Sequence, residues 1–132
     1  MIGLQSELTR RLEENPFFNH LGFEIVEGEG SEIMLKLPVK QDLLNTNKTL
    51  HGGVHASMLD SISTVVLRSL YQTQVRAVNL DVHYFAKSVS GNLYARAKVL
   101  QQGYKLATLE AEIVDDGQQL IAKGTGVYKI VR

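Results

Sequence analysis

Residues 51–71 read HGGVHASMLDSISTVVLRSLY and form the most apolar segment of this 132-residue chain. Its apolar side chains recur every three or four positions, at Val54, Met58, Leu59, Ile62, Val65, Val66 and Leu70. This spacing is typical of an α-helix, and a helix with so few charges is expected to be buried. A rival interpretation is a short strand at residues 63–67, because β-branched side chains lose rotamer freedom in a helix. The 3.6-residue period favours a helix over about residues 52–71.

The residues before this segment predict a short helix and a hairpin. Leu4, Leu8 and Leu12 lie four apart among charged residues, which predicts an amphipathic helix over about residues 3–14 that ends before Pro16. Residues 22–39 alternate apolar and polar side chains on both sides of a Gly-rich turn, which predicts a β-hairpin. The polar residues 40–50 are expected to form a loop.

The residues after the central segment predict only strands. Apolar side chains alternate with polar ones in four segments, at residues 78–85, 93–101, 107–113 and 119–131. A lone apolar helix must be buried against something, and the sheet is the only surface available. We therefore expect one α+β domain over residues 1–132, with an antiparallel sheet wrapped around the central helix.

Composition excludes several classes of function. Lys plus Arg equals Asp plus Glu at 14 each, so no net charge attracts nucleic acid. The chain has no cysteine, and hence neither a disulfide framework nor a thiol nucleophile. Charged residues interrupt both the N-terminal stretch and the central segment, so neither a signal peptide nor a membrane span is expected. We expect a cytoplasmic protein that contacts no membrane.

Asp60 is the first candidate catalytic residue. It is the only acid in the central segment, and its neighbours one turn away are all small, at Ala56, Ser57, Ser63 and Thr64. We expect open space beside this carboxylate. The alternative is that Asp60 lies on a solvated stripe of the helix.

The residues His51, Gly52 and Gly53 lie where the helix is expected to begin. The first amides of a helix have no partner within it and carry the positive end of the dipole, so they can stabilise an oxyanion. The alternative is a turn in which glycine supplies a positive φ.

Other patterns carry less weight. His51 and His55 are four apart, but Gly52 occupies the position of a zinc protease's glutamate and no third ligand is evident, so no metal is expected. The stretch Gly124-Thr125-Gly126 lies in a predicted strand, so it is not a phosphate-binding loop. The serines of the central segment, Ser63 among them, lack a nucleophile-elbow context and suit helix packing.

Taken together, Asn45, the Leu50-His51-Gly52-Gly53 motif, Asp60 and the strand from Val78 to Tyr84 resemble the hotdog-fold thioesterases. The most similar group is the PaaI-type acyl-CoA thioesterases, and the resemblance extends from about residue 18 to residue 128. It implies a long helix wrapped by an antiparallel sheet and a homodimer, or a tetramer of paired dimers, with active sites at the dimer interface. The element order derived from the residues agrees with this fold.

The resemblance also implies roles for individual residues. The Gly52 amide would polarise the thioester carbonyl, Asn45 and His51 would position the reacting groups, and Asp60 of the partner chain would be general base or nucleophile. Asn79 stands where the family has a serine or threonine that holds the attacking water, and an amide side chain can also hydrogen-bond water. Candidate substrate contacts are Gly53, Ser63, Asp81, Tyr84 and, for the coenzyme A phosphates, Lys87, Lys105 and Arg68.

The function expected is hydrolysis of small or medium acyl-CoA or aryl-CoA thioesters without a cofactor, since coenzyme A is part of the substrate. The alternatives are a hotdog enoyl-thioester hydratase or dehydratase, whose histidine and acid signatures are missing around His51, and a non-catalytic acyl-CoA-binding protein. The sequence does not identify the acyl group, although Phe17, Phe18, Tyr71 and Tyr84 are candidates to line its tunnel.

Overall fold

The computed structural model describes residues 20–28, 30, 32–46 and 49–132. The described elements run in the order β1 (Glu24–Glu27), β2 (Ile33–Pro38), the 3-10 helix η2 (Gln41–Leu43), α3 (Gly52–Tyr71), β3 (Val75–Tyr84), β4 (Asn92–Gln102), β5 (Leu106–Asp115) and β6 (Leu120–Ile130). The helix predicted for residues 3–14 and the side chains of Phe17 and Phe18 lie outside the described residues.

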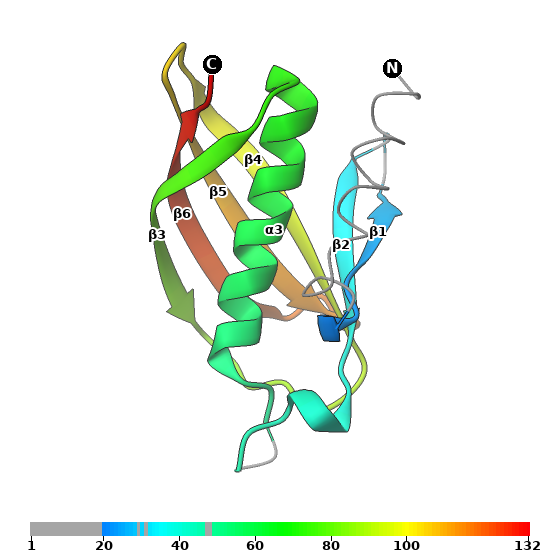
Figure 1. Ribbon diagram of the computed structural model, residues 1–132. Helices are drawn as coiled ribbons and strands as arrows, with labels where there is room; N and C mark the ends of the chain where they lie inside the picture. Colours follow the sequence, from blue (N-terminus) through cyan, green and yellow to red (C-terminus); the bar gives the residue numbers. More distant parts are fainter. Residues whose placement is uncertain (1–19, 29, 31, 47–48) are drawn as a thin grey trace.

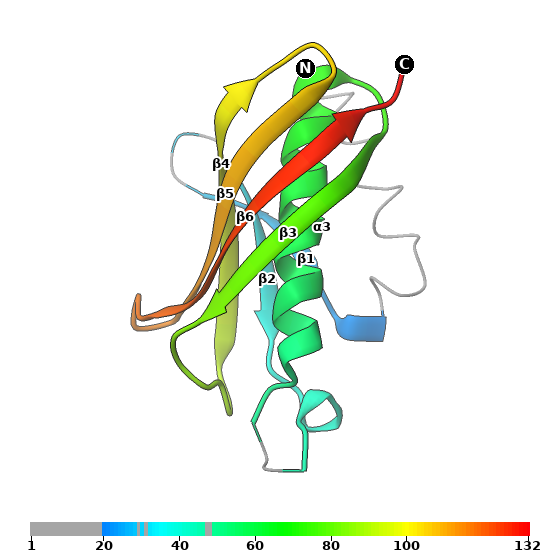
Figure 2. The ribbon, with the colours of Figure 1, turned by 90° about the vertical axis from the view of Figure 1, so that its left-hand side faces the viewer.

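The six described strands form one antiparallel sheet in the order β1-β2-β4-β5-β6-β3. The sheet curves around α3, with β1 and β3 on opposite sides of the helix (Figures 1 and 2). This is the hotdog arrangement, so the predicted α+β fold is confirmed. The rival strand at residues 63–67 is wrong, because these residues lie within α3.

The core lies between α3 and the concave face of the sheet. Met58, Leu59 and Ile62 of the helix are fully buried, as the 3.6-residue period predicts. They pack with alternate side chains of the strands, among them Leu35, Leu37, Leu93, Ala95, Ala111 and Ile113. This packing fixes the rotation of α3, and therefore the directions in which its polar side chains point.

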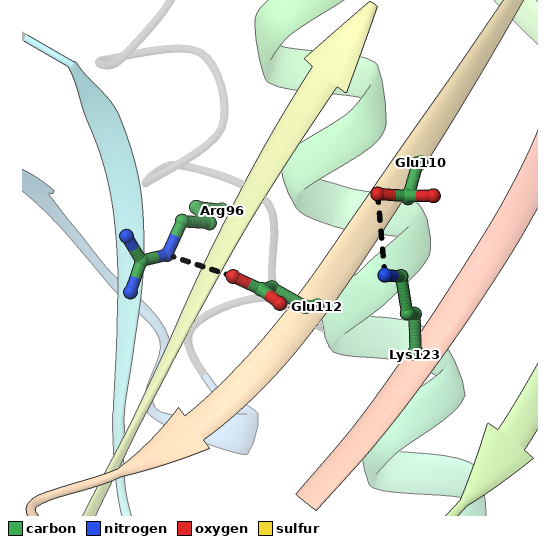
Figure 3. Close-up of polar contacts among 4 residues, drawn as sticks. All are labelled: Arg96, Glu110, Glu112 and Lys123. Carbon is green, nitrogen blue, oxygen red and sulfur yellow. Dashed lines mark ion pairs between the residues drawn. The ribbon is translucent and has the colours of Figure 1, made fainter. Parts of the chain in front are cut away.

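The outer face of the central strands is polar. Glu110 and Glu112 alternate with the buried side chains of β5, and they form ion pairs across the two neighbouring strands. The pairs are Arg96 with Glu112 and Lys123 with Glu110, each at 3.3 Å (Figure 3). Half-exposed pairs of this kind contribute little to stability, about 1 kcal/mol or less.

Strand β3 differs from its expected form. It begins three residues earlier than predicted, and a β-bulge interrupts its pairing with β6 between Ala77 and Asn79. Leu80 and Val82 pack against the core as the alternation predicts. Val78, at the bulge, is 60% exposed and Tyr84 is 52% exposed. The predicted apolar face of this strand is therefore only partly buried, and β3 forms an edge of the sheet.

No helix in the part of the chain that the structure describes is long and apolar enough to cross a membrane.

Candidate active site

The start of α3 is built by His51. This residue is the N-cap, with extended backbone angles, and its Nδ1 accepts a hydrogen bond from the Gly53 amide at 3.0 Å. Accepting through Nδ1 leaves the ring proton of the neutral imidazole on Nε2. The Gly53 amide is thus already engaged, and Gly52 is the first helical residue.

The backbone conformation at Gly52 and Gly53 does not require glycine. Positive φ angles occur at Gly22, Gly30 and Gly91 among the described glycines, and not at Gly52 or Gly53. The alternative interpretation, a turn that needs a positive φ, is therefore wrong. A Cβ built on Gly52 would meet the Tyr84 ring and hydroxyl at 3.5–3.7 Å, which is ordinary contact. The fold would accept a small side chain here, so packing does not require a glycine at this position.

Tyr84 covers this end of the helix. Its hydroxyl donates to the Gly52 carbonyl at 3.0 Å, and its ring meets the His55 ring edge-on with centroids 5.7 Å apart. His55 is buried, and neither of its ring nitrogens has a hydrogen-bond partner among the described residues. Burial lowers the pKa of His55, and the nearby His51 carbonyl has a smaller opposite effect. The apolar period of the helix gave no signal of this burial.

Asn45 lies in the loop that leads to the helix. Its side-chain oxygen accepts from the Thr49 amide at 3.3 Å and the Thr49 hydroxyl at 3.2 Å. Leu44 and Leu50 form an isolated bridge that closes the loop, and the His51 amide donates to the Leu43 carbonyl. The loop is therefore tied to η2 at the point where the helix starts.

Asp60 lies in the third turn of α3 and is half-buried. The hydroxyl of Tyr128, on β6, donates to Asp60 Oδ1 at 2.6 Å. The expected open space beside the carboxylate is thus wrong on this side, because a phenol from a strand 68 residues away fills it. Asp60 itself is only half-buried, so part of it is exposed to solvent, and in this respect the alternative of a solvated stripe agrees with the structure.

Burial of Tyr128 and the neighbouring Asp60 carboxylate raise the pKa of its phenol, so the hydroxyl remains a proton donor. The sequence carried one signal of this contact. Gly124, Gly126 and Tyr128 alternate on one face of a strand, and a large ring after two glycines can lie across them.

Asp60 and the Gly52 amide are separated along the helix. At a rise of 1.5 Å per residue the eight positions between them span about 12 Å. One thioester carbonyl cannot contact both groups of the same chain. The Gly52 amide and an Asp60 carboxylate can therefore act on the same thioester only if they come from two different chains.

The strand candidates lie on β3. The side-chain oxygen of Asn79 accepts from the Val127 amide at 3.2 Å, beside the bulge, so this amide group ties β3 to β6. Asp81 is exposed, two positions along the same face. Both lie on β3, which pairs with β6 alone among the described strands.

The remaining candidates do not gather at one place. Ser63 is completely buried and donates to the Leu59 carbonyl at 2.8 Å, as expected of a packing residue. Lys87 precedes Ser88, whose carbonyl binds the Leu50 amide at the start of α3. Lys105 lies at the other end of α3, in the turn where the Gly103 carbonyl accepts from the Tyr71 hydroxyl. One phosphate of a substrate cannot meet both lysines of the same chain.

The described residues contain no group of three or more His, Cys, Asp or Glu side chains that could hold a metal ion.

Comparisons with known proteins agree with the fold. The family model of the Thioesterase superfamily matches residues 47–122, which is more than half of the chain and includes His51, Gly52, Asp60 and Asn79. A relative from Saccharolobus solfataricus, described as a "Putative esterase", is 24% identical over 128 residues, covering 96% of this chain and 85% of its own.

Two solved structures share the fold. The PaaI protein from the phenylacetic acid degradation operon of E. coli superposes with a TM-score of 0.87 at 21% identity, covering 98% of this chain and 95% of its own. A thioesterase of Haemophilus influenzae superposes with a TM-score of 0.85 at 21% identity, covering 97% and 90%. By the match of the family model, which the fold supports, this chain belongs to the thioesterase superfamily, and that membership supports hydrolysis of thioesters in general.

Proposed function

We propose that the protein is an acyl-CoA thioesterase that hydrolyses small or medium acyl-CoA or aryl-CoA thioesters to the free acid and coenzyme A. The observation that carries the proposal is the half-buried Asp60 carboxylate of α3, which accepts a hydrogen bond from Tyr128 of β6. The same helix begins with the Gly52 amide, which has no hydrogen-bond partner within the helix. A base and an oxyanion donor are the two groups that thioester hydrolysis needs, and no cofactor is required.

In the proposed reaction the carboxylate takes a proton from water while the water oxygen attacks the thioester carbonyl carbon. The negative charge that develops on the carbonyl oxygen is stabilised by the Gly52 N–H. The tetrahedral intermediate then collapses, the C–S bond breaks, and the coenzyme A thiolate leaves. The alternative is direct attack by the Asp60 carboxylate on the thioester carbonyl carbon. The C–S bond then breaks, the coenzyme A thiolate leaves, and water hydrolyses the resulting acyl-carboxylate anhydride to the free acid and the Asp60 carboxylate.

The active site would take residues from two chains. The separation of about 12 Å between Gly52 and Asp60 requires the partner subunit's Asp60 to face this subunit's Gly52. The unpaired edge of β3, with Val78 and Phe85 each 60% exposed, is a surface on which a second copy can pair. We therefore infer a homodimer, and a tetramer if two dimers associate.

The other candidate residues surround this pair of groups. His51, as the cap of α3, and Asn45, in the tied loop, would hold the helix start in position for the thioester. Asn79 would hold the water, and Gly53, Asp81 and Tyr84 would line the substrate path. Ser63 is completely buried and bonded to the Leu59 carbonyl, so it does not contact substrate. Lys87 lies near the start of α3, whereas Lys105 and Arg68 lie at its other end. These side chains would bind the phosphates of one coenzyme A together only in an assembly that brings the two ends of α3 close to each other.

The test is release of free thiol from a panel of acyl-CoAs, aliphatic of several lengths together with phenylacetyl and benzoyl thioesters. Asp60→Asn removes the base and keeps its shape, and should lower kcat by about 10² to 10⁴. Asp42→Asn, at an exposed carboxylate of η2, is the matched control and should keep full activity. Wild-type turnover by Asp60→Asn would contradict the mechanism. Hydration of an enoyl-CoA without thiol release would instead favour a hydratase. Saturable binding of an acyl-CoA with neither reaction would favour a binding protein.

A further inference from the structure

Tyr128 is the one described side chain that forms a hydrogen bond with Asp60. Its hydroxyl donates to Oδ1 at 2.6 Å, a length typical of an O–H donor bonded to a charged carboxylate. The other carboxylate oxygen has no hydrogen-bond partner among the described residues. The two oxygens of Asp60 are thus not equivalent.

We propose that Tyr128 is a positioning residue for Asp60: it holds Oδ1, fixes the plane of the carboxylate, and leaves Oδ2 as the oxygen that acts on the attacking water. The inference rests on the proposed function, since it assigns the orientation of the same catalytic group.

The strand is built to let the phenol reach the helix. Tyr128 lies on the inner face of β6, with Gly126 and Gly124 at the two preceding inward positions. A Cβ on Gly126 would lie 2.9 Å from Tyr128 Cε1, which is closer than real Cβ contacts allow. A Cβ on Gly124 would meet Leu59 Cδ1 at 3.3 Å. The missing side chain at Gly126 lets the ring lie along β6 and carry its hydroxyl to Asp60.

The surroundings keep the phenol in the donor form. Tyr128 is completely buried among Leu67, Leu109 and Ile130, and burial together with the Asp60 charge raises its pKa. The hydroxyls of Ser63 and Thr64 lie near the phenol oxygen and act weakly in the opposite direction. A rigid neutral donor suits positioning, because a base works well only when its oxygen is aligned with the proton it removes.

The primary test compares Tyr128→Phe with Thr73→Val. Each change deletes one hydroxyl that donates to an oxygen, Tyr128 to Asp60 at 2.6 Å and Thr73 to the Val131 carbonyl at 2.7 Å, beyond the far end of α3. We expect Tyr128→Phe to lower kcat by about tenfold to a hundredfold with KM nearly unchanged, because orientation of the base is lost and substrate binding is not. Thr73→Val should keep kcat. Equal kcat values in the two variants would overturn the proposal, as would a loss that appears only in KM.

A second pair of variants separates orientation from folding. Gly126→Ala displaces the Tyr128 ring and should lower kcat to a similar extent, but in the Tyr128→Phe background it should lower kcat little further, because the bond is already lost. Full additivity of the two effects would overturn the proposal. If Gly126→Ala does not fold, the comparison of Tyr128→Phe with Thr73→Val still decides the matter.

A readout without substrate distinguishes this inference from the proposed function. A buried hydroxyl bonded to a carboxylate exchanges slowly with water, so its proton should give a downfield NMR signal that is present in Thr73→Val and absent in Tyr128→Phe. If the signal is missing from the wild type, the positioning contact is wrong whatever the activity. If it is present and no thioester is hydrolysed, the proposed function fails while the contact holds.

Discussion

His55 shows how one residue departs from its sequence pattern. It is 3% exposed, packs edge-on against Tyr84, and has no hydrogen-bond partner at either ring nitrogen within the described residues. An unsatisfied buried polar group costs stability.

We expect His55→Phe to be more stable than the wild type by about 1 kcal/mol at pH 7.5, because an apolar ring of similar shape removes the unsatisfied nitrogens. Burial lowers the pKa of His55 below its ordinary value of 6.5. The unfolded chain therefore binds the proton more readily, and the wild type should lose stability as pH falls from 6.5 towards the lower folded pKa.

This contribution to the pH dependence should be missing from His55→Phe. The measurement is urea unfolding at pH 7.5 and pH 5.5, at one protein concentration, with the exposed His83 changed to Phe as the control. If the free energy of unfolding falls equally in the wild type and in His55→Phe between pH 7.5 and pH 5.5, His55 does not titrate as argued.

At the same scale, Asp60 could be identified from the sequence and its partner could not. The acid stands alone in an apolar helix, which singles it out. Tyr128 is 68 positions away, and its contact depends on how the sheet curves over the helix. Local spacing does not encode that curvature, although the glycines before Tyr128 are compatible with it.

Among the elements, α3 and β4 to β6 follow from periodicity because their inner faces are continuously buried. Strand β3 was predicted less well, since an edge strand has no partner on one side and its side chains need not alternate in burial. Its bulge at Ala77 and Asn79 has no local sequence signal.

The start of α3 allows a clean test of the proposed oxyanion donor. Gly52 is the first helical position, where proline is well tolerated because the N–H has no partner in the helix. The preceding residue, His51, already has the extended angles that proline requires, with φ −62° and ψ 135°. Gly52→Pro should therefore fold normally while it deletes the single N–H in question.

We expect Gly52→Pro to lower kcat by about 10² to 10³, the usual effect of losing one oxyanion-hole donor. Gly52→Ala keeps the N–H and adds a methyl group that the fold accommodates, so its kcat should lie well above that of Gly52→Pro. Thiol release and urea unfolding of both variants give the comparison. Equal activity of the two variants at equal stability would assign the oxyanion to another donor.

For the whole molecule, the surfaces of the sheet differ in a way that matters for assembly. The outer face of β4 to β6 carries ion pairs between half-exposed side chains, which are already satisfied within one chain (Figure 3). The edge at β3 exposes unpaired backbone groups beside Val78, Tyr84 and Phe85. The edge is thus the surface that gains most from a second copy.

If each site takes Gly52 from one chain and Asp60 from the other, two inactive variants should restore activity when mixed. A hybrid dimer of Gly52→Pro with Asp60→Asn has one site with both changes and one site with neither. After subunit exchange at equal concentrations we expect about a quarter of wild-type thiol release, because half the dimers are hybrid and each has one intact site. Each variant mixed with itself is the control. If the mixture is as inactive as its components although exchange is demonstrated by native mass spectrometry, the partner subunit's Asp60 does not act with this subunit's Gly52, and the proposed pairing of these two groups is wrong.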